Sequence, residues 1–322
     1  MGKLTQKQRG KIHTSAIFYK SVRYDAHPLY KLTTYGSHFT LNACFKKYSQ
    51  LLPLMPKLLM LVLLLMSPAI HASKLPWRIV TEPFPPYFSP EMADNGWVHD
   101  LVVLALRKQG IEVNIEYVAW SRAMRLTASG SAVAAMGAYR TAQREQNYYY
   151  SNAIGQSETG FFGKRSLRLE KPLQLDNLKN YIIAKGEEYV VVEGVEDHPG
   201  LSFTHTVDLV TSLYMLLGDR VDLVAGTRQV GEHWLRHHPK LTANPASATI
   251  QFIEPAIATQ NMYMIFGKAL TGNDKRVRLF NEAMAGFVLT GELADLLARH
   301  KLPESDRQRI RLFLQDQFGP QD

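Results

Sequence analysis

The sequence predicts an α/β protein built from two lobes. Short segments of strand length alternate with longer segments whose apolar residues recur every three or four positions, as in amphipathic helices. This alternation runs through two successive sets, and a late apolar segment, Met262–Phe266, follows the second set as a return strand. Alternating strands and helices favour a mainly parallel sheet with helices on its faces. The roughly 250 residues that follow position 72 are enough for two such lobes.

The first set begins with a buried-strand pattern that ends at a proline-rich loop, because proline cannot donate to a strand ladder. Its best-defined helix carries apolar residues at helical spacing and is followed by Gly110. A later run alternates apolar with polar residues, which is typical of a half-buried strand. In chain order we expect a strand at Trp77–Thr81, a helix at Trp97–Lys108, a strand at Ile111–Tyr117, a helix at Ser121–Ser129 and a strand at Ala132–Met136.

The second set repeats the alternation, and glycine again marks the end of a helix at Gly218. The return strand leads into two final helical patterns. In chain order we expect strands at Tyr181–Ala184 and Val190–Glu193, a helix at Leu209–Leu217, a strand at Val221–Ala225, a helix at Thr227–Arg236, the return strand, and helices at Lys275–Leu289 and Glu292–Arg299.

Positive charge is concentrated in the first part of the chain. The formal net charge is +8, but ten of the 37 Lys and Arg residues and only one of the 29 Asp and Glu residues precede Leu58. The remaining 27 bases and 28 acids leave the rest of the chain close to neutral. Such a body lacks the concentrated positive field that binding to a phosphate backbone requires. Nucleic acid is therefore not an expected partner.

The segment 55–72 has the pattern of a cleavable secretory signal. A base precedes a short apolar run, and a proline break and Ala72 follow it. The apolar run is well short of the roughly 20 residues that span a bilayer, and an uncleaved membrane anchor is the alternative. The pattern predicts export to the periplasm, with cleavage after Ala72.

Residues 1–54 precede that signal, although export signals normally begin a chain. We expect 1–54 to be a leader extension that is untranslated or disordered, with translation starting at Met55 or Met60. N-terminal sequencing of the precursor distinguishes these possibilities. The only cysteine, Cys44, lies in this extension, so we expect no disulfide, thiolate metal site or cysteine nucleophile in the exported protein.

Four motifs follow strands or open helices of the first set: Thr81-Glu82-Pro83-Phe84-Pro85-Pro86-Tyr87, Gly96-Trp97-Val98-His99-Asp100-Leu101, Trp120-Ser121-Arg122-Ala123, and Tyr139-Arg140-Thr141-Ala142-Gln143-Arg144-Glu145. In this order and spacing they resemble extracellular solute-binding protein family 3, the periplasmic components of polar amino-acid ABC importers and their relatives. Further matches follow at Gly218-Asp219-Arg220-Val221-Asp222 and Phe266-Gly267-Lys268. The resemblance extends from about Trp77 to Leu302.

The resemblance implies a type II periplasmic-binding-protein-like fold, in which two crossover strands join the lobes and the ligand is held in the cleft between them. Lobe 1 would comprise 73–164 plus 266–322, and lobe 2 would comprise 165–265. A small carboxylate-bearing solute would close the lobes by a hinge motion. An ABC permease in the inner membrane would then recognise the closed form. We expect a monomer that is not an enzyme.

Arg144 is the residue that we expect to bind the carboxylate of the solute. In the family the arginine of a Thr-x-x-Arg run grips a ligand carboxylate, and Arg144 occupies that position. A guanidinium also offers a rigid fork of donors that matches a carboxylate, and Arg144 follows a strand end, where α/β sheets place ligands. The alternative is a surface ion pair with Glu145 or another acid. Thr141 is expected to cap the helix that follows it.

The resemblance assigns further residues to the cleft, each with a plainer alternative. Tyr139 would offer its hydroxyl to the ligand or only pack. Phe84 and Tyr87 would form an aromatic face on which the ligand stacks, or they would belong to the core. Glu82 would meet a ligand amine or be a surface acid.

Trp120 and Arg122 match a family subgroup in which a Trp-x-Arg element lies near the cleft. Their alternative is a tryptophan in the core and a solvated arginine. With Arg140 and Arg144, Arg122 would give the cleft three arginines against one acid, which favours an anionic ligand.

One departure from the family pattern concerns the ligand amine. Amino-acid binders usually carry an acid five residues after the aspartate that corresponds to Asp222, and this chain has Thr227 there. A second family aspartate is replaced near Val133. A buried ammonium without a carboxylate partner is costly, so the departure argues against an ordinary α-amino acid.

Two other functions share this fold. Some relatives are dehydratases that act on cyclic carboxylates, but the sequence shows no convincing catalytic set. His233 and His237 have the spacing of a metal pair on a helix, yet no Glu lies between them in the zinc-protease arrangement, so neither a metal nor a cofactor is expected. The remaining alternative is a ligand-sensing protein that presents its closed form to a sensor kinase, which neighbouring genes would distinguish from transport.

Overall fold

The computed structural model describes residues 75–170 and 173–320. All of them belong to one unit, Ala72–Asp322. The predicted leader extension, 1–54, and the predicted signal segment, 55–72, lie outside the described residues. Within the described ranges, no helix is both long and apolar enough to cross a membrane.

The strands are β1 (Trp77–Thr81), β2 (Val113–Tyr117), β3 (Ala134–Ala138), β4 (Tyr148–Lys164), β5 (Ile182–Gly186), β6 (Ser202–Thr206), β7 (Leu223–Thr227), β8 (Ile250–Phe252) and β9 (Ala258–Gly267). The helices are α3 (Trp97–Lys108), α4 (Trp120–Ala128), α5 (Ala142–Glu145), α6 (Leu209–Leu217), α7 (Arg228–His237), α8 (Pro239–Thr242), α9 (Asn273–Val288), α10 (Glu292–Arg299) and α11 (Glu304–Phe318). Short 3₁₀ turns are η1 (Ala93–Asn95), η2 (Leu175–Leu178) and η3 (Pro245–Thr249).

The strands form one mixed sheet in the order β2-β1-β3-β9-β4-β7-β5-β6, and β8 also pairs with β4. β1 is parallel to β2 and β3, and β5 is parallel to β6 and β7. Between these two parallel groups run β9 and β4, which are antiparallel to each other. The sheet therefore has two parallel parts that are joined by an antiparallel pair.

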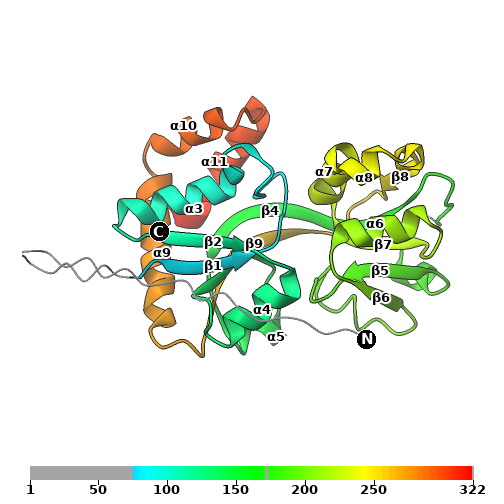
Figure 1. The fold of residues 1–322 in the computed structure, drawn as a ribbon, viewed down its shortest axis with the longest axis horizontal. Helices are drawn as coiled ribbons and strands as arrows, with labels where there is room; N and C mark the ends of the chain where they lie inside the picture. The colour runs from blue at the N-terminus through cyan, green and yellow to red at the C-terminus, as the bar shows by residue number, and fades with distance from the viewer. Residues whose placement is uncertain (1–74, 171–172, 321–322) are drawn as a thin grey trace, which may run out of the picture. The chain divides into compact units, whose positions relative to one another are not determined.

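The pair β4 and β9 connects two groups of elements (Figure 1). β4 pairs with β9 from Tyr148 to Thr159 and with β7 from Thr159 to Gly163. We call the group of β1, β2, β3, α3, α4, α5, α9, α10 and α11 lobe 1, and the group of β5, β6, β7, α6, α7 and α8 lobe 2. This arrangement confirms the predicted α/β fold with two lobes and two crossover strands.

Amphipathic helices cover the sheet as their apolar spacing predicts. In lobe 1, α3 buries Leu101 and Leu106 completely, and in lobe 2, α6 does the same with Leu213 and Leu216. Each such side chain contributes about 1.5–3 kcal/mol through its removal from water. The packing of these helices holds the strand ends, and therefore the loops that follow them, in place.

One strand expected from the sequence is absent. No strand forms at Val190–Glu193; these residues lie in an irregular segment of bends and turns, and the next strand after β5 is β6 at Ser202–Thr206. The amide of Val191 bonds to the Glu196 carboxylate at 2.7 Å instead of to a neighbouring strand. The three consecutive valines made the segment resemble a buried strand, whereas the β-branched threonines of β6 alternate with bulkier residues at the sheet edge.

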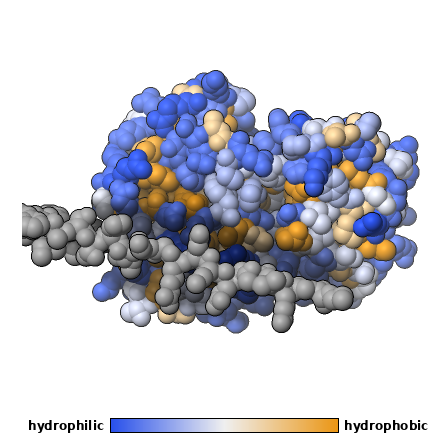
Figure 2. Space-filling view, in the orientation of Figure 1, coloured by the Kyte–Doolittle hydropathy of each residue, from blue (hydrophilic) through white to orange (hydrophobic). Residues whose placement is uncertain are grey.

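The surface of the described residues carries apolar side chains only in scattered places. The face shown in Figure 2 is mostly hydrophilic, with small separate apolar patches. The large exposed apolar residues come from different elements: Leu75, Tyr149, Ile182, Val207, Leu279, Leu289 and Leu312. Single exposed apolar residues of this kind are normal for a protein surface and mark no interface by themselves.

Gly267, the last residue of β9, packs directly against the backbone of helix α4 in lobe 1. A Cβ at this position would lie 1.9 Å from the carbonyl oxygen of Thr127 in α4. Because a backbone atom of a packed helix cannot move aside cheaply, we expect Gly267→Ala to lower the free energy of unfolding by about 2–3 kcal/mol. Urea unfolding followed by circular dichroism measures this loss.

The matched control is Gly286→Ala in α9, where the nearest atom to an added Cβ is a Gln109 side-chain nitrogen at 3.8 Å. Alanine there should leave stability unchanged or raise it by about 0.5–1 kcal/mol, because glycine is a poor residue for a helix interior. Equal stability of the two variants would show that β9 and α4 are not packed as closely as described.

Candidate functional site

A cavity of about 40 Å³ lies where the two lobes meet. Lobe 1 contributes the carboxyl end of β1, the loop that follows it and the end of β3; lobe 2 contributes the carboxyl end of β7 and the segment after β5. Ligands of α/β proteins bind beside the carboxyl ends of the strands. The cavity therefore lies at the place where the topology predicts a site.

Arg144 is held over this cavity by a short helix, α5. Thr141 precedes the helix, and its hydroxyl accepts a hydrogen bond from the Arg144 amide at 3.2 Å, which confirms the predicted cap. The guanidinium donates to the carbonyl of Tyr139 at 3.1 Å and to the carbonyl of Glu188, and it lies 5.9 Å from the centre of the Trp120 ring. The side chain is 7% exposed.

No ion pair in the described part of the chain involves Arg144. Its two carbonyl partners are neutral, and burial lowers its pKa from the ordinary value, although the charges of Glu188 and Glu196 oppose this change. A buried cation without an opposite charge is unfavourable unless something supplies that charge. The site is therefore electrostatically incomplete at Arg144 and suited to an anion.

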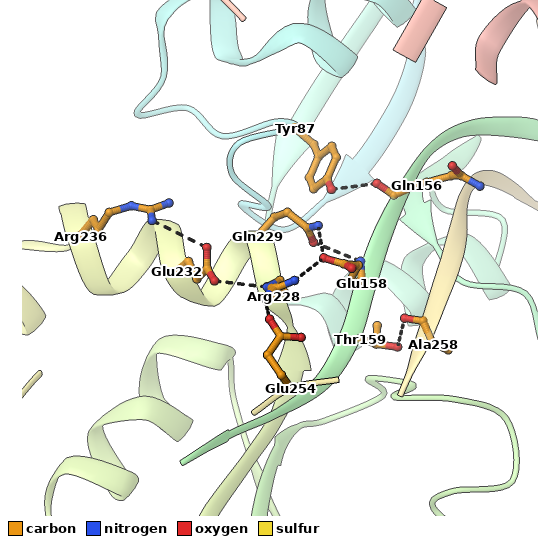
Figure 3. Close-up of polar contacts among 10 residues, drawn as sticks. All are labelled: Tyr87, Gln156, Glu158, Thr159, Arg228, Gln229, Glu232, Arg236, Glu254 and Ala258. Carbon is orange, nitrogen blue, oxygen red and sulfur yellow. Dashed lines mark hydrogen bonds and ion pairs between the residues drawn. The ribbon is translucent and has the colours of Figure 1, made fainter. Parts of the chain in front are cut away.

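Arg228 in the same protein shows the contrasting arrangement (Figure 3). This residue begins α7, and its guanidinium lies 3.0 Å from a Glu158 oxygen and 3.4 Å from a Glu232 oxygen, with Glu254 as a third partner. These contacts hold α7 against β4 and against the loop before β9. The charge of Arg228 is thus neutralised by protein carboxylates, whereas that of Arg144 is not.

Glu82, which follows β1, is the acid of the cavity. It is 7% exposed, and the Tyr189 hydroxyl donates a hydrogen bond to its carboxylate at 2.8 Å. Burial raises the pKa of Glu82 to about 8; the hydrogen bond from Tyr189 opposes this rise, and the nearby Asp208 charge adds to it. The carboxyl group therefore carries a proton at neutral pH unless a cation approaches it.

Tyr139, which follows β3, forms hydrogen bonds to β4 and to β7. Its hydroxyl lies 2.7 Å from the hydroxyl of Ser157 on β4 and 2.7 Å from that of Thr227 on β7. Burial raises the pKa of Tyr139 to about 12, so the phenol stays protonated. Tyr139 and Thr227 both line the cavity, and their hydroxyls bond to each other across the two lobes.

The aromatic residues divide between the cavity and the core. Phe84 lines the cavity and stacks on Phe88 and Tyr87, with ring centres 5.5 and 5.7 Å apart. Tyr87 is buried but does not line the cavity; its hydroxyl donates to the carbonyl of Gln156 at 2.8 Å (Figure 3). Trp120 lines the cavity.

The structure does not bring three arginines together. Arg122 is exposed and lies outside the residues that line the cavity, and Arg140 is exposed and paired with Glu145. Only Arg144 reaches the cavity. Within the described residues, the positive charge expected for an anionic ligand therefore comes from this one buried arginine.

Glu188 and Tyr189, which come from the segment after β5, also contribute to the site and are not predicted by the sequence motifs. The carbonyl of Glu188 accepts from Arg144 and, at 3.2 Å, from the Trp120 indole. Tyr189 follows the carboxyl end of the predicted strand Tyr181–Ala184, and this position could have indicated a site residue. Because a strand is expected at Val190–Glu193, Tyr189 is not considered part of a loop at the site. Among the residues that the structure describes, no group of three His, Cys, Asp or Glu side chains could hold a metal ion.

No protein-family model and no curated protein matches this chain. Solved structures do match it, at low sequence identity. A histidine kinase sensor domain with similarity to periplasmic binding proteins is 17% identical, with a TM-score of 0.61 over 70% of this chain and 96% of that one. The arginine-, lysine-, histidine-binding protein ArtJ from Geobacillus stearothermophilus is 20% identical, with a TM-score of 0.58 over 73% of this chain and 99% of that one.

An ancestral arginine-binding protein bound to glutamine is 16% identical, with a TM-score of 0.58 over 77% of this chain and 99% of that one. At these identities the likeness concerns the fold. The chain has the fold of the periplasmic binding proteins, with a cavity between its two α/β lobes.

Proposed function

We propose that the chain is a periplasmic solute-binding protein that captures a small carboxylate-bearing solute between its lobes for an ABC importer. The observation that carries the proposal is the buried guanidinium of Arg144, which faces the interlobe cavity without a carboxylate partner in the described part of the chain. A bound carboxylate supplies the missing charge through the two parallel hydrogen bonds that a guanidinium offers.

The cavity contains an acid that could pair with an amine of the ligand, but this acid, Glu82, comes from lobe 1. Thr227 occupies the position where the family pattern has an acid on lobe 2, whereas Glu82 lines the same cavity from the end of β1. An amine beside Glu82 would favour its charged form and form an ion pair with it. The ligand class is therefore an amino acid or a related carboxylate whose amine, where it has one, lies toward Glu82.

The solute must rearrange the site to enter it. A cavity of about 40 Å³ has room for only a few water molecules. Two-lobed proteins of this fold open and close about their crossover strands, which here are β4 and β9. The described conformation is thus a closed one, and binding involves motion between the lobes.

Thermal unfolding of the purified protein against a panel of solutes tests the proposal. The panel comprises amino acids, amines, dicarboxylates and cyclic acids, and scanning fluorimetry reports the unfolding temperature. A ligand at 100 times its dissociation constant stabilises the folded state by about 2.7 kcal/mol, which is readily seen as a rise in melting temperature.

We expect a carboxylate-bearing solute to give this shift and amines that lack a carboxylate to give none. Stabilisation by the simple amines alone would contradict the proposal. Conversion of the stabilising solute into a product, followed by mass spectrometry, would instead support the dehydratase alternative.

The likeness to a histidine kinase sensor domain supports a second candidate, in which the closed protein is presented to a sensor kinase. This candidate uses the same cleft and the same Arg144. Cross-linking of the liganded protein in cells to a permease or to a sensor kinase distinguishes the two.

A further inference from the structure

The segment Gly186–Val191 of lobe 2 occupies the middle of the cleft. The carbonyl of Glu188 accepts hydrogen bonds from Arg144 and Trp120, and the hydroxyl of Tyr189 donates to Glu82 at 2.8 Å. Both polar groups that the proposed solute would use on lobe 1 are therefore already bonded to lobe 2. A carbonyl takes the position of the carboxylate, and a phenol takes the position of the amine.

Tyr189 lies beside three hollows between the lobes. Besides the cavity of about 40 Å³, hollows of about 430 and 410 Å³ lie beside it, and Tyr189 lines all three. Arg144 lines the first and the last of them, and Glu82 lines the first two. Tyr189 is the one described residue that all three hollows share.

The segment is held firmly by its own lobe. Lys185 donates to the carbonyl of Tyr189 at 2.9 Å, and the amide of Val191 bonds to Glu196. Glu188 has a φ of +64°, a left-handed conformation that is unfavourable for a residue with a side chain. Such conformations persist where surrounding contacts impose them, and they are common in segments that switch between states.

Gly186 is what allows the ring of Tyr189 to lie in this position. A Cβ on Gly186 would come within 2.6 Å of two atoms of the ring. The φ of Gly186 is not positive, so glycine is not required here for its backbone conformation. It is required because a side chain would occupy the space that the Tyr189 ring fills. A single methyl group at this position would push the ring away from Glu82.

We infer that the segment Gly186–Val191 is an internal occupant of the cleft, which holds the lobes closed in the absence of solute and which a solute must displace. The segment therefore competes with the solute for the cleft. The more tightly it binds to lobe 1, the smaller is the fraction of protein that is open to the solute, and the lower is the apparent affinity for the solute. Displacement by a solute rests on the proposed function, whereas closure of the lobes by this segment can be measured without any solute.

The test measures the distance between the lobes without any solute. Spin labels are placed on cysteines introduced at the exposed Ala128 of lobe 1 and Ala243 of lobe 2, in the full chain with Cys44→Ser. The protein is unfolded in guanidinium and refolded to remove bound solute, and double electron–electron resonance gives the distance distribution.

We expect one short distance in the parent protein and a longer second distance in both Tyr189→Phe and Gly186→Ala. Loss of a partly buried hydrogen bond of this kind shifts the closed-to-open ratio by about 5- to 10-fold. The matched controls are Tyr214→Phe, whose buried hydroxyl has no hydrogen-bond partner among the described residues, and Gly218→Ala, where an added Cβ has ordinary contacts. Both controls should retain the parent distribution.

Identical distributions in the parent and in both test variants, or an already open parent, would overturn the inference. Circular dichroism confirms that each variant is folded before the distances are compared. Because no solute is present, failure here leaves the proposed binding function untouched, and a solute panel without a hit leaves this inference untouched.

Discussion

Replacement of Arg144 by alanine is expected to weaken binding of the solute by about 2–5 kcal/mol, the loss typical when one partner of a buried charge pair is removed. The solute's carboxylate would then be buried without an opposite charge, because the described residues place no other arginine in the cavity. Isothermal titration calorimetry with the solute identified by the thermal panel measures the change.

Two variants accompany this measurement. Arg122→Ala removes an exposed arginine that does not line the cavity and should leave the affinity unchanged. Arg144→Lys keeps the charge but loses the planar fork, so its affinity should lie between those of the parent and Arg144→Ala. An unchanged affinity in a folded Arg144→Ala protein would remove this residue from the site.

The second large effect concerns the pH dependence of stability. Burial raises the pKa of Glu82 from its ordinary value of 4.5 to about 8. Between these pH values the folded protein holds this proton more tightly than the unfolded chain does, so stability falls as the pH rises. The stabilisation of the folded protein by this tightly held proton is complete below pH 4.5 and is lost above pH 8. It amounts to about 4–5 kcal/mol of unfolding free energy.

Glu82→Gln isolates this contribution. Glutamine cannot ionise, yet its carbonyl still accepts the hydrogen bond from Tyr189. We expect the stability of Glu82→Gln relative to the parent to increase steadily from pH 5 to pH 8 in urea unfolding. Glu187→Gln, which changes an exposed acid, should follow the parent throughout. Parallel curves for Glu82→Gln and the parent would show that Glu82 ionises normally.

Much of the fold could be predicted because local sequence patterns specify it. Trp97–Lys108, Leu209–Leu217 and Glu292–Arg299 form helices with the predicted bounds. Each has a continuous apolar face, and the first two are followed within two residues by glycine. Such signals act over a few turns of one helix and do not depend on tertiary contacts.

The long crossover strand β4 could not be read from the sequence. Its 17 residues pair with β9 in one part and with β7 in another, so its surroundings change along its length. Neither regular alternation nor a uniform apolar run results. The helix α11 was missed as well; only Leu314 and Phe318 of its residues are buried, which leaves a weak periodic signal.

Within the candidate site, the residues recognised through local motifs come together where the strand ends meet. Arg144, Tyr139, Glu82, Phe84, Trp120 and Thr227 all line the cavity, whereas Tyr87 and Arg122 do not. The contribution of Glu188 and Tyr189 depends on contacts across 44 to 107 positions of the chain. Such contacts follow from the closure of the two lobes, which no local pattern encodes.

The central claim, that Arg144 binds a carboxylate of the solute, is tested most directly by a comparison of the identified solute with its uncharged carboxamide. Both are titrated into the parent protein and into Arg144→Ala, and the four affinities form a double-mutant cycle. We expect the parent to bind the carboxamide at least about 30-fold more weakly, which corresponds to about 2 kcal/mol, and Arg144→Ala to bind both forms alike. Equal binding of both forms by the parent, or full discrimination by Arg144→Ala, would contradict the claim.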